Sequence, residues 1–356
     1  MTALQAKECL KIASTNGGNE FSETLWTAVC SGTNMKLVIV NENEAGQRLD
    51  KLLAKYLSEA SKSFLYKMLR KKNITLNNKK ANGNEKTALH DEIRFFLSDE
   101  TFEKFSKKNT DITNIKMTSK LQIIYEDKHI LLLNKPANML SQKAKSSDIS
   151  INEEMLAYLL ETEQITGEEL KTFRPAVCNR LDRNTSGLIV AGKTLIGLQT
   201  MAEVFKDRSL HKYYLCLVSG EVVKEQTIDG WLTKDEKQNK VQISRECTEG
   251  ALPIHTQYTP LETKNGITLL KVWLITGRSH QIRAHLASIG HPIIGDAKYG
   301  NRKVNQKFAE AFGVKYQMLH SYQLVMPQIK GELGYLSGKE FTAKVPLVFD
   351  KVFGIC

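Results

Sequence analysis

The sequence predicts a mixed α/β fold divided into two domains, and three observations lead to this prediction. The chain has 356 residues, 41% hydrophobic and 25% charged, which is ordinary globular composition at a length that suits two domains. A basic segment before residue 102 combines helical and strand patterns. From residue 118 onward, strand-like apolar runs alternate with shorter helical patterns, without a repeat of fixed period.

The expected N-terminal module spans residues 35–102, and MKLVIV at its start predicts a strand. RLDKLLAKYL and SKSFLYKMLRKKNI carry apolar residues at helical spacing, so each predicts a short amphipathic helix. Ser61 or Ser63 would be the N-cap of the second helix. ITLNNKKAN then predicts a strand followed by an Asn-Asn turn, and DEIRFFLSD predicts another strand.

Two polar segments flank this module. Residues 1–34 contain scattered Gly, Asn, Ser and Thr, and we expect a disordered leader or an upstream start-site artefact. Residues 103–117 lack a clear period and are predicted to be a linker. The mixed α/β domain would then occupy residues 118–356.

Composition excludes several classes of protein. No run approaches the roughly 18 apolar residues that a membrane span needs, and no signal peptide pattern is present, so the cytoplasm is the expected compartment. The six cysteines form no C-x-x-C pair, which argues against a zinc site and a disulfide framework. A net charge of +11 favours a polyanionic partner, although charge alone does not separate RNA from DNA or an anionic membrane.

Positive charge is concentrated in the N-terminal module. Between Arg48 and Lys80 there are ten basic residues and two acidic ones, Asp50 and Glu59. Taken alone, such lysines fit a solvated surface as well as a binding face. The stretch resembles the S-four-type (αL) RNA-binding domain over about sixty residues, through GQRLDKLLAKYL, SKSFLYKMLRKKNITLNNKKAN and DEIRFFL. The resemblance implies docking on structured RNA through shape and phosphates. The residues expected to contact RNA are Arg48, Lys51, Lys62, Lys67, Arg70, Lys71 and Lys72.

In the second domain, LQIIYED, HILLLNKP, GLIVAG, YYLCLV and ITLLKVWLI predict strands, and TLIGLQTMAEVFKDR predicts a helix. One of these runs, GLIVAGKT from Gly187 to Thr194, matches the phosphate-binding pattern G-x-x-x-x-G-K-[ST]. In a phosphate loop the variable residues form the turn after a strand. Here they are Leu, Ile, Val and Ala, which favour the buried strand itself. We therefore reject a nucleotide triphosphatase.

The turn before that strand, NRLDRNTSG, places Asp182 between Arg180 and Arg183. An idle exposed ion pair is the common explanation of such a pattern. The alternative is a carboxylate that neighbouring guanidinium groups keep ionised, and therefore available as a nucleophile. In SLHKYYLCLVSG, alternation places Tyr214 and Tyr213 on opposite faces of a strand, and we expect Tyr213 to be a core residue.

A third polar stretch, TGRSHQIRAHLASIGHPIIGDAKYG, predicts a helix from about Ser279 to Gly290. Ile282, Leu286 and Ile289 form its apolar stripe, and Arg283 lies at the border of the buried face. Because a buried guanidinium needs an anion, we expect Arg283 to pair with Asp182. The three histidines nearby, at spacing H-x4-H-x5-H, fit no common metal site, so no metal is expected.

Together these stretches resemble the RluA-type family of RNA pseudouridine synthases. The family signature H-R-L-D-x-x-T-S-G appears as NRLDRNTSG, K-x-Y as Lys212 to Tyr214, and T-G-R-x-H-Q-I-R-x-H from Thr276 to His285. IIYEDKHILLLNKPANML and QMLHSYQL near His320 extend the resemblance over residues 118 to about 350.

The resemblance implies an α+β fold, with a mixed, mainly antiparallel sheet in the catalytic domain. It implies conversion of uridine to pseudouridine without a cofactor, with large-subunit ribosomal RNA as the favoured substrate. The sequence gives no information on the oligomeric state, and a monomer is the default expectation. Asp182 would be the nucleophile, attacking ribose or base. Tyr214 would lie against the target base and help to remove a proton, Arg283 would pair with Asp182, and Arg180 would help to extrude the uridine. The expected substrate-binding residues are Arg180, Arg183, Thr185, Ser186, Arg278, His280 and Gln281.

Two positions depart from the family pattern. Asn179 replaces the usual first histidine, and Asn138 replaces the usual glycine of N-K-P-A-G. The second change is mild, because Asn tolerates left-handed backbone conformations. The first leaves open an alternative function, a catalytically inactive RNA-binding or ribosome-assembly factor that retains the fold.

Overall fold

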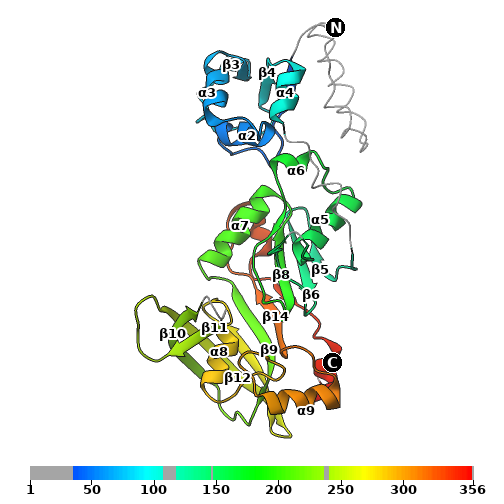
Figure 1. The fold of residues 1–356 in the computed structure, drawn as a ribbon, viewed down its shortest axis with the longest axis vertical. Coiled ribbons are helices and arrows are strands. Elements are labelled where there is room, and N and C mark those ends of the chain that lie inside the picture. Colours follow the sequence, from blue (N-terminus) through cyan, green and yellow to red (C-terminus); the bar gives the residue numbers. More distant parts are fainter. Residues whose placement is uncertain (1–34, 107–117, 146, 236–239, 355–356) are drawn as a thin grey trace. The chain divides into compact units, whose positions relative to one another are not determined.

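The computed structural model describes residues 35–106, 118–145, 147–235 and 240–354 (Figure 1). The chain forms two compact units. The first comprises the described residues of Met1–Asn114 with Thr166–Arg174, and the second comprises those of Ile115–Ile165 and Pro175–Cys356. The expected leader 1–34 and most of the expected linker lie outside the described residues. No described helix is long and apolar enough to cross a membrane.

The first unit has a four-stranded sheet in the order β1-β4-β2-β3 and four helices. Its elements are β1 (Lys36–Ile39), α2 (Leu49–Tyr56), α3 (Lys62–Arg70), β2 (Ile74–Leu76), β3 (Lys79–Lys80), β4 (Glu92–Phe95), α4 (Asp99–Phe105) and α6 (Glu169–Thr172). Every strand and helix predicted for this module is present. Ser61 is the N-cap of α3, since its hydroxyl accepts the Phe64 N–H at 3.2 Å.

Two features of this unit were not predicted. Helix α4 continues to Phe105, so residues 103–105 are helical and not irregular linker. Its buried Phe102 packs edge-on against Phe95, and this contact stabilises the helix. The helix has too few apolar residues for a helical spacing to be recognised in the sequence. In addition, α6 packs with α2 in this unit, where Lys55 Nζ donates to the Thr172 carbonyl at 2.7 Å.

The second unit is built on an eleven-stranded sheet, whose main path runs β11-β10-β12-β13-β9-β14-β8-β6-β5. Its strands are β5 (Ile123–Glu126), β6 (Ile130–Lys135), β7 (Ala176–Val177), β8 (Ser186–Gly192), β9 (His211–Ser219), β10 (Gln226–Asp235), β11 (Lys240–Ser244), β12 (Leu252–Lys264), β13 (Ile267–Leu274), β14 (Leu319–Val325) and β15 (Glu340–Thr342). Its helices are α5 (Ile151–Glu161), α7 (Leu195–Lys206), α8 (Gln281–Ser288), α9 (Arg302–Phe312), α10 (Leu347–Phe353) and the 3-10 helix η1 (Gly331–Leu336).

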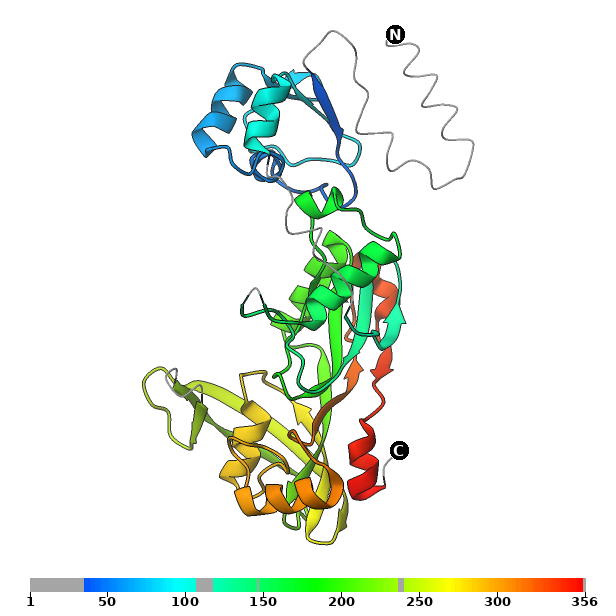
Figure 2. The same cartoon turned by 45° about the vertical axis from the view of Figure 1, so that its right-hand side comes forward.

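Pairing in this sheet is antiparallel except between β14 and β8, among the strands that the structure describes. The predicted α+β class with a mainly antiparallel sheet is therefore confirmed. Strands β9 and β14 lie at the centre, between β8, β6 and β5 on one side and β13, β12 and β10 on the other (Figures 1 and 2). The polar turns that carry the sequence motifs meet near this centre.

The rejected phosphate-loop motif falls on β8, all of whose residues are buried. Its variable positions are strand, as the apolar residues predict. Lys193, which follows the strand, donates to the Glu126 carboxylate at 2.7 Å and to the Asp127 carbonyl at 2.8 Å. The backbone amides therefore pair within the sheet, and the lysine is occupied by an acidic partner.

Candidate active site

Asp182 lies in the turn that enters β8, and the backbone on each side of it is held by a buried side chain. Ser141 Oγ accepts the Leu181 N–H and donates to the Leu181 carbonyl, both at 2.9 Å. Lys135 Nζ donates to the Arg183 carbonyl at 3.1 Å. Asp182 is thus fixed between two anchored neighbours, which orients its carboxylate with little freedom.

Lys135 is an unusual anchor because its side chain is fully buried. Besides Arg183, its ammonium donates to the carbonyls of Pro136 and Met139, both at 2.8 Å. Burial lowers the pKa of Lys135 to about 7, and the nearby Asp182 charge acts in the opposite sense. Three carbonyl acceptors match the three N–H groups of the charged form.

The residues at the two ends of the N-R-L-D-R-N-T-S-G motif, Asn179 and Gly187, have structural roles. Gly187 has φ +112°, and a Cβ there would lie 2.2 Å from the Ser321 carbonyl oxygen, so only glycine allows β8 to approach β14. At the other end, Asn179 Oδ1 accepts the Val190 N–H at 2.8 Å, and its amide donates to the Leu188 carbonyl at 3.3 Å. Asn179 therefore ties the turn to β8. Asn138 adopts φ +66°, the left-handed conformation expected there.

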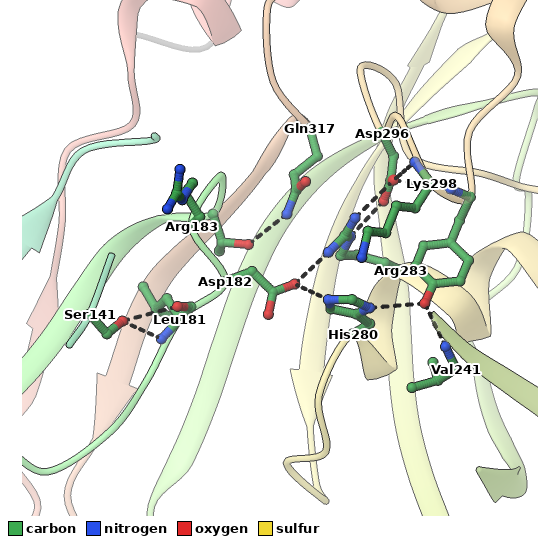
Figure 3. A network of polar contacts seen from close by, with 12 residues as sticks. Ser141, Leu181, Asp182, Arg183, Val241, His280, Arg283, Asp296, Lys298 and Gln317 are labelled. Atoms are coloured by element: carbon green, nitrogen blue, oxygen red, sulfur yellow. Dashed lines mark hydrogen bonds and ion pairs between the residues drawn. The ribbon is translucent and has the colours of Figure 1, made fainter. Parts of the chain in front are cut away.

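Arg283, from helix α8, pairs with Asp182 as expected, with Nη1 2.7 Å from Asp182 Oδ2 (Figure 3). A second carboxylate, Asp296, holds the same guanidinium: its Oδ2 accepts from Nε at 2.7 Å and its Oδ1 from Nη2 at 3.0 Å. Burial acts to raise the pKa of Asp296, but the hydrogen bonds and charge of Arg283 outweigh it and lower that pKa. The side chain of Asp182 is 27% exposed, whereas Asp296 is fully buried. Asp182 is thus the carboxylate within reach of a ligand.

Helix α8 differs in one respect from the sequence prediction. It spans Gln281–Ser288, inside the expected limits, but its first six residues are all buried, so there is no polar face at its start. The polar members are satisfied by neighbouring groups: Gln281 bonds to Thr276 at 2.9 Å and His285 to Thr256 at 3.0 Å. Spacing within one helix does not reveal such partners.

Tyr214 is buried on β9 and lines the same cleft as Asp182. Burial raises the pKa of its phenol to about 12; the charge of Asp182 adds to this, and a hydrogen bond with Ser321 opposes it. Tyr213, on the opposite face, is only half-buried and packs against Trp273 with ring centroids 6.3 Å apart, so the expectation that it is a core residue was wrong. An amphipathic ring at a half-covered sheet face produces the same sequence alternation as a core residue.

The cleft has a volume of about 1130 Å³, slightly above the usual range of ligand pockets, and the described residues around it are strongly basic. Asp182 is the one acidic side chain among them, and the basic side chains are Lys143, Arg180, Arg183, Lys206, Arg208, Lys212, Arg278, Arg283 and Lys298. Such a lining favours a polyanion whose reacting group reaches a single carboxylate.

The predicted substrate-binding residues divide into two groups. Arg180, Arg183, Arg278 and His280 line the cleft, and the Nε of Arg278 is buried without a partner among the described residues. The side chains of the other three are engaged in hydrogen bonds within the protein: Thr185 accepts from Gln317 at 2.9 Å, Ser186 bonds to His320 at 2.8 Å, and Gln281 bonds to Thr276. Of these, Ser186 does not line the cleft in the described chain.

Sequence reasoning missed four residues that build the site, which are Lys135, Ser141, Asp296 and Tyr299. Asp296 had a usable signal, because it is a lone acid that follows the apolar run PII after a single glycine in PIIGDAKYG. A buried carboxylate in such a position implies a cationic partner. Ser141 offered no such signal.

In the first unit, all seven residues expected to contact RNA are exposed. Arg48 is also paired with Asp50, with Nη2 3.0 Å from Oδ2, so its charge is partly compensated. Lys67 and Arg70 lie in the last turn of α3, where positive charge also suits the helix dipole. Exposure and charge are compatible with a binding face.

Comparison with known proteins identifies the family. A family model described as RNA pseudouridylate synthase matches residues 129–288. The chain is 30% identical over 292 residues to ribosomal large subunit pseudouridine synthase C of Vibrio vulnificus, covering 81% of this chain and 87% of that protein. It is 29% identical over 299 residues to the protein of the same name from Escherichia coli, covering 82% and 88%.

A solved structure supports the fold. Human RNA pseudouridylate synthase domain containing 4 aligns with a TM-score of 0.51 and 22% identity, over 65% of this chain and 90% of that one. With the family model and the curated relatives, the motifs NRLDRNTSG and TGRSHQIRAH and the cleft at which they meet lead to one conclusion: the chain belongs to the RNA pseudouridylate synthase family, the isomerases that convert uridine in RNA to pseudouridine.

Proposed function

We propose that this enzyme isomerises uridines of large-subunit ribosomal RNA, with Asp182 as the nucleophile. The observation that carries the assignment of Asp182 is its position as the one carboxylate among the described residues of a basic cleft, 2.7 Å from a buried arginine. The relatives named as large-subunit synthases support the choice of RNA, since they cover more than four fifths of the chain.

The reaction breaks the bond between N1 of the base and C1′ of the ribose and forms a bond between C5 and C1′. C5 loses a proton and N1 gains one, so the isomerisation needs no redox partner and no added group. Within the described chain, Arg283 contacts Oδ2 of Asp182 and no residue bonds to Oδ1. We assign bond formation with the nucleotide to Oδ1, while the guanidinium holds Oδ2 in place.

Tyr214 is the second catalytic residue of this proposal. With its pKa raised to about 12, the phenol stays protonated at neutral pH in the free enzyme. This favours a role in packing against the flipped base and donating a hydrogen bond. Removal of the C5 proton by Tyr214 would require the bound nucleotide to lower that pKa. Arg180, exposed at the cleft, is positioned to contact the phosphate of the extruded uridine.

Seven of the basic residues of the first unit, those expected to contact RNA, form the second RNA contact of this proposal, an S-four-type surface that recognises structured RNA through phosphates. A concentration of exposed positive charge on α2 and α3 supports it. Such a surface adds affinity with little sequence selectivity, whereas the cleft selects the uridine.

The test of Asp182 is the variant Asp182→Asn, which keeps the size of the side chain and removes its charge. We expect RNA affinity and the melting temperature to stay close to those of the unaltered protein, while pseudouridine formation on large-subunit RNA is abolished. Retained turnover would refute the assignment. Mapping pseudouridines in ribosomal and transfer RNA from cells with and without the gene tests the substrate, and loss confined to transfer RNA would contradict our proposal.

A further inference from the structure

The imidazole of His280 stands beside Asp182 and has a defined partner on each ring nitrogen (Figure 3). Its Nε2 lies 3.9 Å from Asp182 Oδ2, and its Nδ1 lies 2.9 Å from the Tyr299 hydroxyl. The side chain is 11% exposed and lines the cleft. The backbone of His280 has φ +54°, a conformation that costs a residue with a Cβ about 1–2 kcal/mol. The surrounding structure therefore holds this residue firmly.

The Tyr299 hydroxyl determines which nitrogen of His280 carries the proton. Its oxygen accepts the backbone N–H of Val241 at 2.9 Å. A backbone N–H only donates, so the single phenolic proton is left for the other partner, Nδ1 of His280. A proton on Nδ1 would leave the phenolic proton without a partner among the described residues, so the arrangement favours Nδ1 as the acceptor. The proton of the neutral ring is then on Nε2, the nitrogen that faces Asp182.

The neutral form of the ring is favoured by its surroundings. Burial has the largest effect on the pKa of His280 and lowers it; the charges of Arg283 and Lys298 act in the same direction, and those of Asp182 and Asp296 oppose it. Protonation would also place a donor on Nδ1, against the proton of Tyr299. These charged groups, with Tyr299, are the ionisable side chains that the structure places against the ring.

Asp296 positions both side chains that reach Asp182, which are Arg283 and, through Tyr299, His280. Asp296 Oδ1 accepts the backbone N–H groups of Lys298 at 2.8 Å and Tyr299 at 3.1 Å, besides its bonds to Arg283. Tyr299 also lies against the Arg283 guanidinium, 5.2 Å from ring centroid to Cζ. The guanidinium and the imidazole therefore approach Oδ2 of Asp182 from a common support.

We propose that Tyr299 and His280 form a positioning relay, in which Tyr299 holds His280 as the Nε2–H tautomer so that a fixed donor faces Asp182 and the target nucleotide. The inference rests on the proposed role of Asp182 and extends it to two residues outside the turn. Through Val241 the relay begins on strand β11. Tyr299 is a positioning residue here, because it acts on the site only through His280.

The first test is spectroscopic and independent of activity. In protein labelled with 15N-histidine, His280 is assigned by the signal lost in His280→Gln. We expect the neutral Nε2–H tautomer at neutral pH, and a shift toward the Nδ1–H tautomer or a mixture in Tyr299→Phe. An Nδ1–H tautomer or an imidazolium in the unaltered protein would overturn the relay, even if Asp182→Asn is inactive as proposed. Conversely, turnover in Asp182→Asn would leave the tautomer result intact.

The second test is a double-mutant cycle on kcat. Hydrogen-bond partners that fix the tautomer of a metal-ligating histidine contribute about 10–100-fold to activity, and by analogy Tyr299→Phe is expected to lower kcat in that range with little change in KM. The amide of Gln has no tautomers for Tyr299 to select. Tyr299→Phe in a His280→Gln background should therefore lower kcat by less than about twofold. An equal loss in both backgrounds would show that Tyr299 acts only through stability, and would refute the relay. His280→Asn, whose amide does not reach the position of Nε2, should lose more activity than His280→Gln.

Discussion

Asp296→Asn removes the charge that balances a buried guanidinium and leaves a side chain of the same size. The bidentate pair has N–O distances of 2.7 and 3.0 Å, with side-chain exposures of 7% for Arg283 and 0% for Asp296. Removing one partner of a buried pair costs about 3–5 kcal/mol. Asn retains one carbonyl oxygen, and Asp182 still neutralises Nη1. We therefore expect a loss in the free energy of unfolding at the lower limit of this range, about 3 kcal/mol.

For a domain of this size, about 1 kcal/mol corresponds to roughly 2–4 °C in Tm, so the expected loss is about 6–12 °C. Trp231 and Trp273 lie on strands of the second unit, so tryptophan fluorescence in urea or on heating reports its unfolding. The matched control is Asp229→Asn, whose partner is His255. Their side chains are 67% and 45% exposed, so this pair is expected to contribute less than about 1 kcal/mol.

The pH dependence gives a further check on the sign of this effect. Because the pKa of Asp296 is lowered in the folded state, its stabilisation is complete above the unfolded pKa of about 4 and is lost as the pH falls through the folded value. The difference in the free energy of unfolding between the unaltered protein and Asp296→Asn should be constant near neutral pH. It should shrink toward zero as the pH falls into the acid range. A difference below about 1 kcal/mol at neutral pH, or one that grows in acid, would refute the reasoning.

Three further outcomes are expected. Tyr214→Phe should lower kcat at least about tenfold and leave RNA affinity unchanged, whereas Tyr213→Phe, on the other face of β9, should be nearly neutral; the reverse order in a pseudouridine assay would contradict the proposed register. Lys135→Met should destabilise the second unit by about 3 kcal/mol in urea unfolding, because it leaves three carbonyls without a donor, and a change under about 1 kcal/mol would argue against the anchor. Lys67→Glu combined with Arg70→Glu should weaken RNA binding and lower the slope of log affinity against log salt concentration by about one per lost phosphate contact, with a small decrease in Tm because both charges suit the helix dipole of α3; unchanged affinity would remove α3 from the RNA surface.

Local patterns were enough to predict most of the strands and helices that position the site. The alternation in YYLCLV and the continuous apolar run GLIVAG are both strands at the centre of the sheet, because a strand buried on one or both faces leaves that pattern in the sequence. In the second unit, helices α5, α9, α10 and η1 and strands β7, β10 to β12, β14 and β15 were missed. Strands β10 and β12 are half-exposed over long stretches, so their apolar period is weak.

The part of the candidate site that the sequence predicted is the ion pair, because the charges of its residues are visible in the sequence. Arg283, at the border of the buried face of its helix, implied an anionic partner, and Asp182 lies 2.7 Å from it in the structure. The second carboxylate on Arg283 was not expected. A guanidinium has five N–H groups, and a sequence gives no indication of how many anions share them.

The sequence by itself determined the family motifs, and it predicted the pairing of Asp182 with Arg283, because a buried guanidinium needs an anion. The tertiary structure alone decided that Ser141 and Lys135 anchor the turn, that Asp296 supports both arms of the site, and that Tyr299 directs the proton of His280. These contacts join residues from separate elements of the sheet, and one sequence does not show which buried donors and acceptors lie within 3 Å of one another.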